Sequence, residues 1–434
     1  MPFQIENGVL LKYTEESGVT NITVPAGVTE IGTKAFAGCK GIFSVMLPAG
    51  VKYIGRSAFA GCAALCGIGL PESVSEIGAL AFAGCRNLRS FAVPAGITRI
   101  RRGTFKRCGE LRSVRIPDSV TVIEEEAFFE CRRLPEIALP EGITAIGKAA
   151  FRNCAALKSI RIPQGMDGIG EALFAGCTSL GEVILPDSLT HIQMQAFRDC
   201  RRLREIRLPD TVESIGAFAF SGCKRLRDFT FPPRITRIAT GLLQYCRSIE
   251  QLNVPETVQS IGRWAMNGCA ALTHLTLPET VREISKNAFL NCNSTYMIRM
   301  RPDEPFCRAY CSSSSRGEVL TCIFEMFRTG DYTPEAQKSM KLTLTGQYFA
   351  RTHDAKLAAY IRENLHAYME WFILSANAQW FIAAVTEEPG MFTEESIDTY
   401  IEMAQQKQKT EIFMQLINYK NAHFGFDGSP KLRL

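Results

Sequence analysis

The chain has 434 residues, of which 46% are hydrophobic and 21% charged, and its formal net charge is +5. This composition is ordinary for a soluble globular protein, and no uninterrupted run approaches the roughly 18 apolar residues of a membrane span. The first residues have neither a basic start nor a long apolar stretch, so the sequence predicts no signal peptide and a cytoplasmic location. The charge is uneven, because residues 1–315 carry 37 Lys and Arg against 29 Asp and Glu, whereas residues 316–434 carry 12 against 15.

The N-terminal residues predict a hairpin. Apolar and polar residues alternate from Phe3 to Leu10 around Asn7-Gly8, and Asn-Gly is the strongest short-range signal for a two-residue turn. We therefore expect residues 1–18 to form a hairpin cap that covers the open edge of the structure that follows.

From Pro25 onward a 23-residue unit repeats without a gap to about residue 300. Pro, Ile and Cys each recur twelve times at this interval, and Phe recurs ten times in a fourth column. A fixed period of this length is typical of a solenoid, in which one coil cannot bury its apolar face alone and its neighbours stack on it. We expect these columns to form the core, and their members include Ile31, Phe36, Cys39, Ile146, Phe151 and Cys154.

Each unit contains signals for two strands and one tight turn. In Lys158–Ile162 the Ile residues alternate with polar residues, which predicts a half-buried strand that stacks into a parallel sheet at about 4.8 Å per coil. Val28–Ile31 predicts a second, shorter strand, and Gly32 predicts a corner with a positive φ. Ala35–Cys39 predicts one helical or 3₁₀ turn.

The repeated pattern L-x-x-I-x-L-P-x-x-V-x-x-I-G-x-x-A-F-x-x-C resembles the BspA-like class of leucine-rich repeats over residues 19–300. This resemblance implies a curved solenoid with a concave parallel sheet, and binding or adhesion rather than catalysis. The pattern weakens at the end, where Thr295 replaces Leu and Met300 replaces the aliphatic residue before Pro. The predicted fold class is an α/β repeat, namely a leucine-rich-repeat solenoid of about twelve coils with a C-terminal all-helical domain.

The C-terminal part has a different periodicity. Residues 301–315 contain two Pro and a run of Ser, which predicts a junction, and residues 316–434 predict several short helices. Thr333, Thr393 and Thr410 are the expected helix starts, and apolar residues recur at helical spacing after them. The run from Asn377 to Asn421 resembles ankyrin-like helical tails, although the T-P-L-H signature of ankyrin repeats is absent.

The 16 Cys residues do not predict a disulfide framework or a metal site. Twelve of them lie in one column beside the Phe and Leu columns, where a free thiol packs as a small hydrophobic group. The four outside that column, Cys66, Cys307, Cys311 and Cys322, lack zinc-site spacing. The five His residues form no known catalytic motif. We therefore predict no catalytic residue, no metal and no cofactor, and we keep an enzyme site in the helical tail as an alternative.

The candidate binding residues are basic side chains on the predicted concave strands. Counting each unit from its Pro, Lys or Arg recurs at offsets 18 and 21 and in the loop just before, and acidic residues lie between them at offset 19. We expect this basic track to comprise Arg89, Arg112, Arg115, Lys158, Arg161, Arg202, Arg204, Arg207, Arg225 and Arg227. One interpretation is a solvated face of cross-strand pairs, and the other is a surface for an acidic partner.

The interleaved acids and the scarcity of aromatic residues argue against a nucleic-acid platform. The sequence therefore predicts a non-enzymatic scaffold that binds an acidic protein or peptide on its concave face. The alternative is a cell-surface adhesin that reaches the surface by an unrecognised route. The identity of the partner and the oligomeric state do not follow from the sequence.

Overall fold

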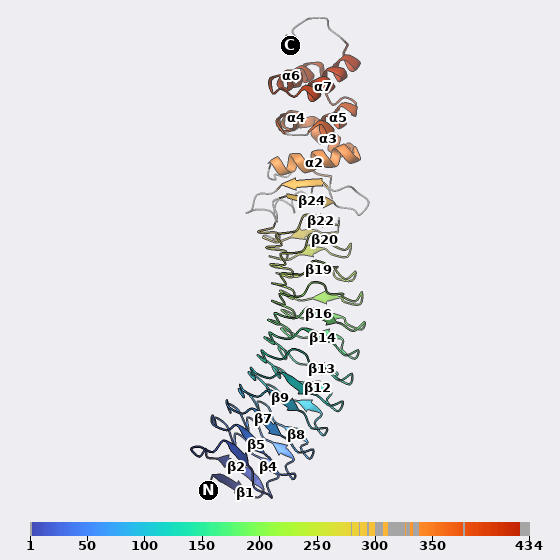
Figure 1. Ribbon diagram of the computed structural model, residues 1–434. Helices are drawn as coiled ribbons and strands as arrows, with labels where there is room; N and C mark the ends of the chain where they lie inside the picture. Colours follow the sequence, from blue (N-terminus) through green and yellow to red (C-terminus); the bar gives the residue numbers. More distant parts are fainter. Residues whose placement is uncertain are drawn as a thin grey trace. The chain divides into compact units, whose positions relative to one another are not determined.

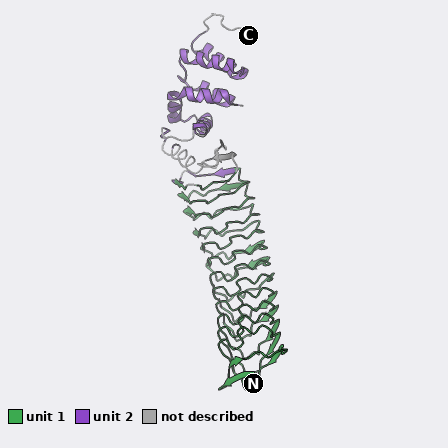
Figure 2. Ribbon diagram, turned by 90° about the vertical axis from the view of Figure 1, so that its left-hand side faces the viewer, with its two compact units in different colours: residues 1–273, 283–293 green, residues 274–282, 294–434 purple. Residues whose placement is uncertain are grey.

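A computed structural model describes residues 2–278, 280–285, 287–292, 295–299, 307–310, 326, 330–332, 338–375 and 378–425. The chain forms two compact units (Figure 2), and each is described by itself. Unit 1 comprises residues 1–273 and 283–293, and unit 2 comprises residues 274–282 and 294–434. The predicted helix start at Thr333 and the predicted positions of Met300, Cys311 and Cys322 lie outside the described residues.

Unit 1 begins with the hairpin that the Asn-Gly pair predicts. Strands β1 (Phe3–Glu6) and β2 (Val9–Tyr13) pair antiparallel, and Asn7 and Gly8 between them both have a positive φ, of 51° and 77°. Two successive left-handed residues form the turn that matches the twist of a hairpin. Strand β2 also pairs in parallel with β4 (Glu30–Ile31), so the hairpin lies on the edge of the first coil.

After the hairpin, the coils of unit 1 stack along two ladders of short parallel strands (Figure 1). The first ladder has two-residue strands that end at the Ile column: β4, β6 (Tyr53–Ile54), β8 (Glu76–Ile77), β10 (Arg99–Ile100), β12 (Val122–Ile123), β13 (Ala145–Ile146), β15 (Gly168–Ile169), β17 (His191–Ile192), β18 (Ser214–Ile215), β19 (Arg237–Ile238), β21 (Ser260–Ile261) and β23 (Glu283–Ile284). This parallel-sheet solenoid is the fold that the 23-residue period predicts.

The second ladder lies at offsets 19 to 21, just before each Pro. Its strands in unit 1 are β3 (Asn21–Thr23), β5 (Ser44–Met46), β7 (Gly67–Gly69), β9 (Ser90–Ala92), β11 (Ser113–Arg115), β14 (Ser159–Arg161), β16 (Glu182–Ile184) and β20 (Gln251–Asn253). The coils pair in register at the 23-residue interval, as in Ile160 opposite Val183. Offset 20 is buried in most coils and offsets 19 and 21 face outward in most, because successive side chains of a strand alternate between its two faces. This outward face of the second ladder is called the strand face below.

The repeated apolar columns fill the interior of unit 1. Every Ile of the first ladder and every Phe of the fourth column is buried. The Phe rings of neighbouring coils stack from Phe36 to Phe220 with centroids 4.9–6.0 Å apart. Tyr13 of the hairpin continues this stack, because its ring centroid lies 5.1 Å from that of Phe36. Such offset stacks add to the free energy of burial, since aromatic pairs contribute about 0.5–1.5 kcal/mol beyond their area.

The column cysteines are free thiols within this core, and they share one hydrogen-bonding pattern. From Cys62 to Cys292, each Sγ donates to the carbonyl oxygen 26 residues earlier, as Cys154 does to Phe128 at 3.2 Å. Burial favours the neutral thiol, and it raises the pKa of Cys108 and of Cys154 to about 12. The thiols are therefore packed donors that satisfy backbone carbonyls.

Two local predictions about the coil are wrong. Gly32 does not have a positive φ; the left-handed residues lie at offsets 9 and 13, as in Lys34 (61°) and Gly38 (80°). The glycine column has a steric cause instead, because a Cβ atom on Gly55 would lie 2.7 Å from the backbone of Gly32. The predicted helical turn consists of two tight turns, since the i→i+3 hydrogen bonds are present but the left-handed residues interrupt any helix.

Unit 2 contains strand β24 (Thr295–Arg299), which pairs in parallel with β22 (His274–Thr276) and antiparallel with β25 (Cys307–Tyr310). Its described helices are α2 (Lys338–Thr352), α3 (Ala355–Glu363), α4 (Leu365–Leu374), α5 (Gln379–Glu387), α6 (Glu394–Gln406) and α7 (Thr410–His423). These helices stack in successive layers (Figure 1). Among them, none has the length and apolar character that crossing a membrane requires.

The start of α6 is the one that the sequence predicts at Thr393. The Thr393 hydroxyl accepts a hydrogen bond from the Ser396 N–H at 3.1 Å, and the Ser396 hydroxyl accepts one from the Thr393 N–H at 2.9 Å. This reciprocal pair satisfies two backbone donors that a helix N-terminus otherwise leaves unpaired. The apolar face of α6 is buried as expected, from Ile397 to Ala404.

Candidate functional site

The structure places every basic residue of the predicted track at the protein surface. Offset 18 carries Arg89, Arg112, Lys158, Arg204 and Arg227, offset 21 carries Arg115, Arg161 and Arg207, and the preceding loops carry Arg202 and Arg225; all are exposed. They belong to different coils of the second ladder, and their proximity therefore depends on which coils are neighbours.

The structure brings some of these residues together and separates others. Arg112 donates its backbone N–H to the Arg89 carbonyl oxygen at 2.7 Å, and Arg227 donates to Arg204 at 2.9 Å, so each pair occupies one position on adjacent coils. Lys158, in contrast, has Pro135 and Gly181 as its backbone partners on the two sides. The predicted track is thus two separate groups, with Lys158 between them.

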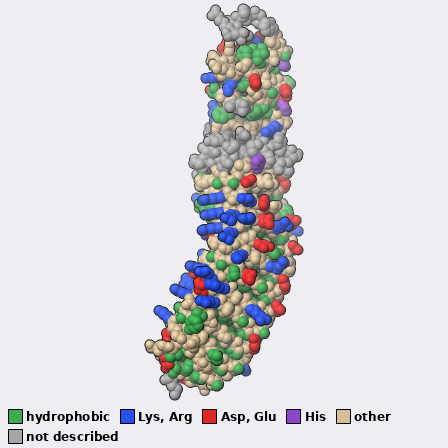
Figure 3. Space-filling view, viewed as in Figure 1, with side chains coloured by type: hydrophobic (Ala, Val, Ile, Leu, Met, Phe, Trp, Pro, Cys, Tyr) green, Lys and Arg blue, Asp and Glu red, His purple; other side chains and the backbone are tan. Residues whose placement is uncertain are grey.

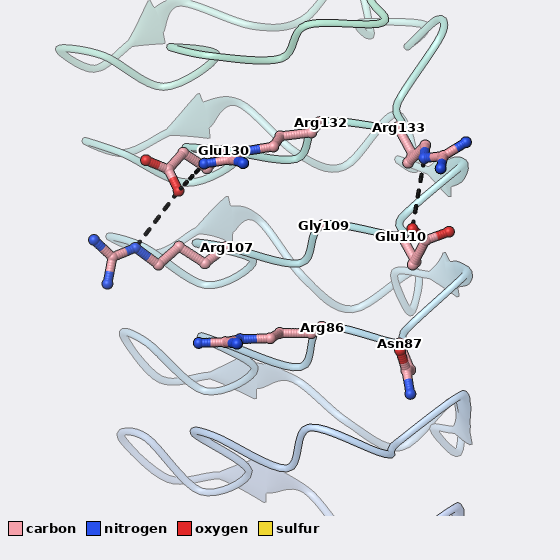
Figure 4. A pocket seen from close by; sticks show the side chains of 8 residues that line it. All are labelled: Arg86, Asn87, Arg107, Gly109, Glu110, Glu130, Arg132 and Arg133. Atoms are coloured by element: carbon pink, nitrogen blue, oxygen red, sulfur yellow. Dashed lines mark hydrogen bonds and ion pairs between the residues drawn. The ribbon is translucent and has the colours of Figure 1, made fainter.

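In the group nearer the N-terminus, carboxylates pair with Arg112 and with arginines beside it, whereas Arg89 and Arg115 form no ion pair among the described residues. Glu130 pairs with Arg107 at 3.7 Å and with Arg132 at 3.2 Å, and Glu110 pairs with Arg133 at 3.5 Å and Arg112 at 3.6 Å. Figure 4 shows three of these pairs around a hollow of about 550 Å³. The hollow is lined by Arg86, Asn87, Arg107, Gly109, Glu110, Glu130, Arg132 and Arg133. An incoming anion would have to compete with these carboxylates.

The second group is a set of neighbouring cations without carboxylate partners among the described residues. We call it the basic cluster, and it comprises Arg202, Arg204, Arg207, Lys224, Arg225, Arg227 and Arg247. In the part of the chain that the structure describes, none of these seven takes part in an ion pair within 4.0 Å. The neighbouring Arg201 does have one, with Asp199 at 3.7 Å. In Figure 3, Lys and Arg side chains gather in rows over successive coils, and acidic side chains lie beside them.

Acidic residues lie next to the basic cluster without neutralising it. Glu205 and Asp228 are opposite one another as a parallel bridge between two coils, and both side chains are exposed. They are the acidic residues at offset 19 of these two coils, and among the described residues they form no ion pair with Arg204 or Arg227.

The sequence analysis did not distinguish the paired group from the unpaired one. The available signal was the repeat interval itself, because Arg107 and Glu130, and likewise Glu110 and Arg133, are 23 residues apart. Residues at this spacing occupy the same position on adjacent coils, so opposite charges there pair and like charges do not. Applied to residues 201–250, this rule predicts the unpaired like charges of Lys224 and Arg247 and of Arg202 and Arg225. Arg227 is an exception, because Glu250 lies 23 residues after it and the two form no ion pair among the described residues.

Comparison with protein families gives one matching model, described as "BspA type Leucine rich repeat region (6 copies)", which matches residues 12–131, 98–209 and 190–303. No relative is found among the curated proteins. Solved structures similar to this chain include a leucine rich cell surface protein from Faecalibacterium prausnitzii A2-165 (26% identity, 68% of this chain and 90% of that chain, TM-score 0.44). A leucine-rich repeat protein from Bacteroides ovatus ATCC 8483 is 25% identical, and the match covers 64% of this chain and 92% of that chain with a TM-score of 0.46. The T. pallidum Leucine Rich Repeat protein is 30% identical, and the match covers 51% of this chain and 83% of that chain with a TM-score of 0.32.

Proposed function

The chain belongs to the BspA-type leucine-rich repeat family, and on this premise we propose that unit 1 is a non-enzymatic scaffold that binds an acidic segment of a partner protein on its strand face. The residues that carry the binding are those of the basic cluster. Arg89, Arg112, Arg115, Lys158 and Arg161 extend the same face toward the N-terminus.

The observation that supports this proposal is the absence of ion pairs in the basic cluster among the described residues. Arg204 and Arg227 leave adjacent coils at one position, and parallel strands are about 4.8 Å apart. Like charges at this separation repel one another, and an external anion between them relieves the repulsion. Arginine suits carboxylates because its planar guanidinium donates two parallel hydrogen bonds to one carboxylate.

The charge pattern favours a polypeptide over a nucleic acid as the partner. The acidic row of Glu205 and Asp228 runs directly beside the arginines, and it would repel the continuous negative charge of a phosphate backbone. Single-stranded nucleic acid also needs aromatic platforms on which its bases stack, and none of the residues at offsets 18, 19 and 21 of these two coils is aromatic. A protein segment can place carboxylates over the arginines and neutral or basic groups over the acids.

Capture from native lysate with a charge-matched control tests the proposal. One variant changes Arg202, Arg204, Arg225 and Arg227 to Gln; the control changes the ion-paired Arg101, Arg102, Arg107 and Arg133 to Gln. We expect the first variant to lose a partner that contains an acidic segment and the control to retain it, with capture decreasing as salt is raised. Equal capture by both variants, independent of salt, would show that the cluster is only a solvated surface.

An adhesin at the cell surface is the second candidate function, because the family resemblance implies adhesion as well as binding. One structural relative is described as a cell surface protein, a statement about that protein. Fractionation of native cells, combined with protease treatment, separates the two candidates. An adhesin is digested by protease added to intact cells, whereas a cytoplasmic scaffold is digested only after the cells are made permeable.

A further inference from the structure

The strand face changes its chemistry from one end to the other. At offset 18, Cys66 donates its backbone N–H to the Phe43 carbonyl oxygen at 2.9 Å, Arg89 donates to Cys66 at 3.3 Å, and Arg112 donates to Arg89 at 2.7 Å. These four residues are consecutive members of one column. The column is therefore apolar on its first two coils and cationic on the next two.

The column at offset 21 shows the same change. Met46 is opposite Gly69 on the next coil, and Ala92 is opposite Arg115. Met46 and Phe43 are 68% and 53% exposed, the highest values among the large hydrophobic side chains of unit 1 that the structure describes. Figure 3 shows hydrophobic side chains gathered toward the N-terminal end of unit 1 and Lys and Arg farther along.

The coil beside Phe43 and Met46 has no outward side chains on its strand, because Gly67 and Gly69 occupy the outward positions. A Cβ atom on Gly67 or Gly69 would meet no other atom within 4 Å, so the space above this strand is open. We call Phe43, Met46, Cys66, Gly67, Gly69 and Ala92 the apolar end of the strand face. An aromatic or aliphatic side chain placed over the glycines would contact Phe43 and Met46 from the side and would remove their apolar surface from water.

The apolar end is continuous with cations that have no partner. Arg89 and Arg115 form no ion pair among the described residues, and they lie one and two coils beyond the glycine strand, respectively. A ligand that covers the apolar end and continues along the strand face would therefore reach Arg89 and Arg115. Burial of an apolar side chain and pairing of carboxylates can both be supplied by one extended peptide.

We propose that the acidic segment carries an apolar anchor, an aromatic or large aliphatic residue that seats on the apolar end while the following carboxylates pair with Arg89 and Arg115. This proposal rests on the proposed function and specifies the partner further. Phe43 and Arg89 are two coils apart, or about 10 Å, and an extended chain rises about 3.3 Å per residue. The first carboxylate therefore follows the anchor by about three residues.

Direct binding to the full chain tests the inference with three fluorescent peptides. The first contains six Glu alone, the second has Trp-Leu joined to six Glu through two Ser, and the third replaces Trp-Leu with Ser-Ser. We expect the anchored peptide to bind about tenfold more tightly than the other two, because it buries an aromatic side chain. If no peptide binds, the proposed function fails, whereas equal binding of all three overturns only the anchor.

A double variant assigns the gain to the apolar end. Phe43→Ser with Met46→Ser should abolish the tenfold gain and leave the affinity for six Glu unchanged. The matched control, Tyr53→Ser with Met194→Ser, removes exposed apolar side chains from other columns and should retain the gain. If the Phe43 and Met46 variant retains the gain in affinity, the anchor assignment is overturned. It is also overturned if light scattering shows that the parent protein is a dimer and this variant a monomer, because the apolar end would then contact another copy of the chain.

Discussion

The backbone N–H of Arg227 donates to the carbonyl oxygen of Arg204 at 2.9 Å, so two arginine side chains leave adjacent coils at the same position. Neither has an ion pair among the described residues. Like charges directly opposite one another on paired strands destabilise a sheet. The isolated protein therefore carries an unfavourable charge interaction at the surface that we propose for binding.

The first prediction follows from this pair. Arg227→Gln removes the repulsion, and we expect the free energy of unfolding to rise by about 0.2–1 kcal/mol at low ionic strength. The difference should disappear at high salt, because exposed charges are screened there. Urea unfolding at two salt concentrations measures it, and a loss of stability at low salt would contradict the account.

The glycine column gives a second prediction. A Cβ atom at Gly55 would lie 2.7 Å from the backbone of Gly32, whereas one at Gly50 would lie 3.7 Å from its nearest neighbour, the Val28 carbonyl oxygen. Gly55→Ala should therefore cost about 1–3 kcal/mol of stability as the coils are pushed apart. Gly50→Ala is the matched control and should change stability by less than about 0.5 kcal/mol. Comparable melting of the two variants would show that the coils are not in the described register.

Thiol labelling gives a third prediction. Of the 13 cysteines whose burial the structure describes, Cys66 alone is not buried. Burial raises the pKa of the column thiols, and that of Cys154 to about 12. Because the thiolate is the reactive form, the column thiols should react with a disulfide reagent only after denaturation. Cys66→Ser should remove one rapidly labelled thiol. Rapid modification of Cys108 or Cys154 in the native protein, detected by peptide mapping, would contradict the buried arrangement.

The same thiols predict a loss of stability at alkaline pH. Their pKa in the folded protein is raised above the ordinary value of 9.0, so the unfolded chain loses these protons first as pH rises. Stability is therefore fully present below pH 9 and decreases between about pH 9 and 12, by about 1.4 kcal/mol per thiol for each pH unit. Replacing Cys131, Cys154 and Cys177 with Ala should reduce the slope of unfolding free energy against pH; an unchanged slope would exclude the thiols as its cause.

The repeat made the solenoid predictable from the sequence, because every column has one structural role in every coil. Ile31 and Phe36 are buried for the same reason as Ile146 and Phe151. A correct interpretation of one repeat unit therefore applies to every coil. The Asn7-Gly8 turn and the Thr393 cap were predictable because each depends on local residues only.

The features that escaped prediction depend on backbone conformation or on contacts between coils. The left-handed residues at offset 9 include Lys34, Ser57 and Leu80, which share no side-chain chemistry that could have marked them. Gly32 was correctly singled out but for the wrong reason, since close packing of coils is invisible within one unit. The division of the arginines into paired and unpaired groups required comparing charges 23 residues apart.

The central claim is that the unpaired arginines, rather than the net positive charge, bind an acidic segment. The most direct test is a fluorescence anisotropy titration of a hexaglutamate peptide with the parent protein, with Arg204→Gln/Arg227→Gln and with Arg107→Gln/Arg133→Gln. Both variants lose the same charge, but only the second removes arginines that already have carboxylate partners. We predict that the first variant weakens the dissociation constant about tenfold, which corresponds to about 1.4 kcal/mol, while the second leaves it unchanged; equal affinity of all three proteins would contradict the claim.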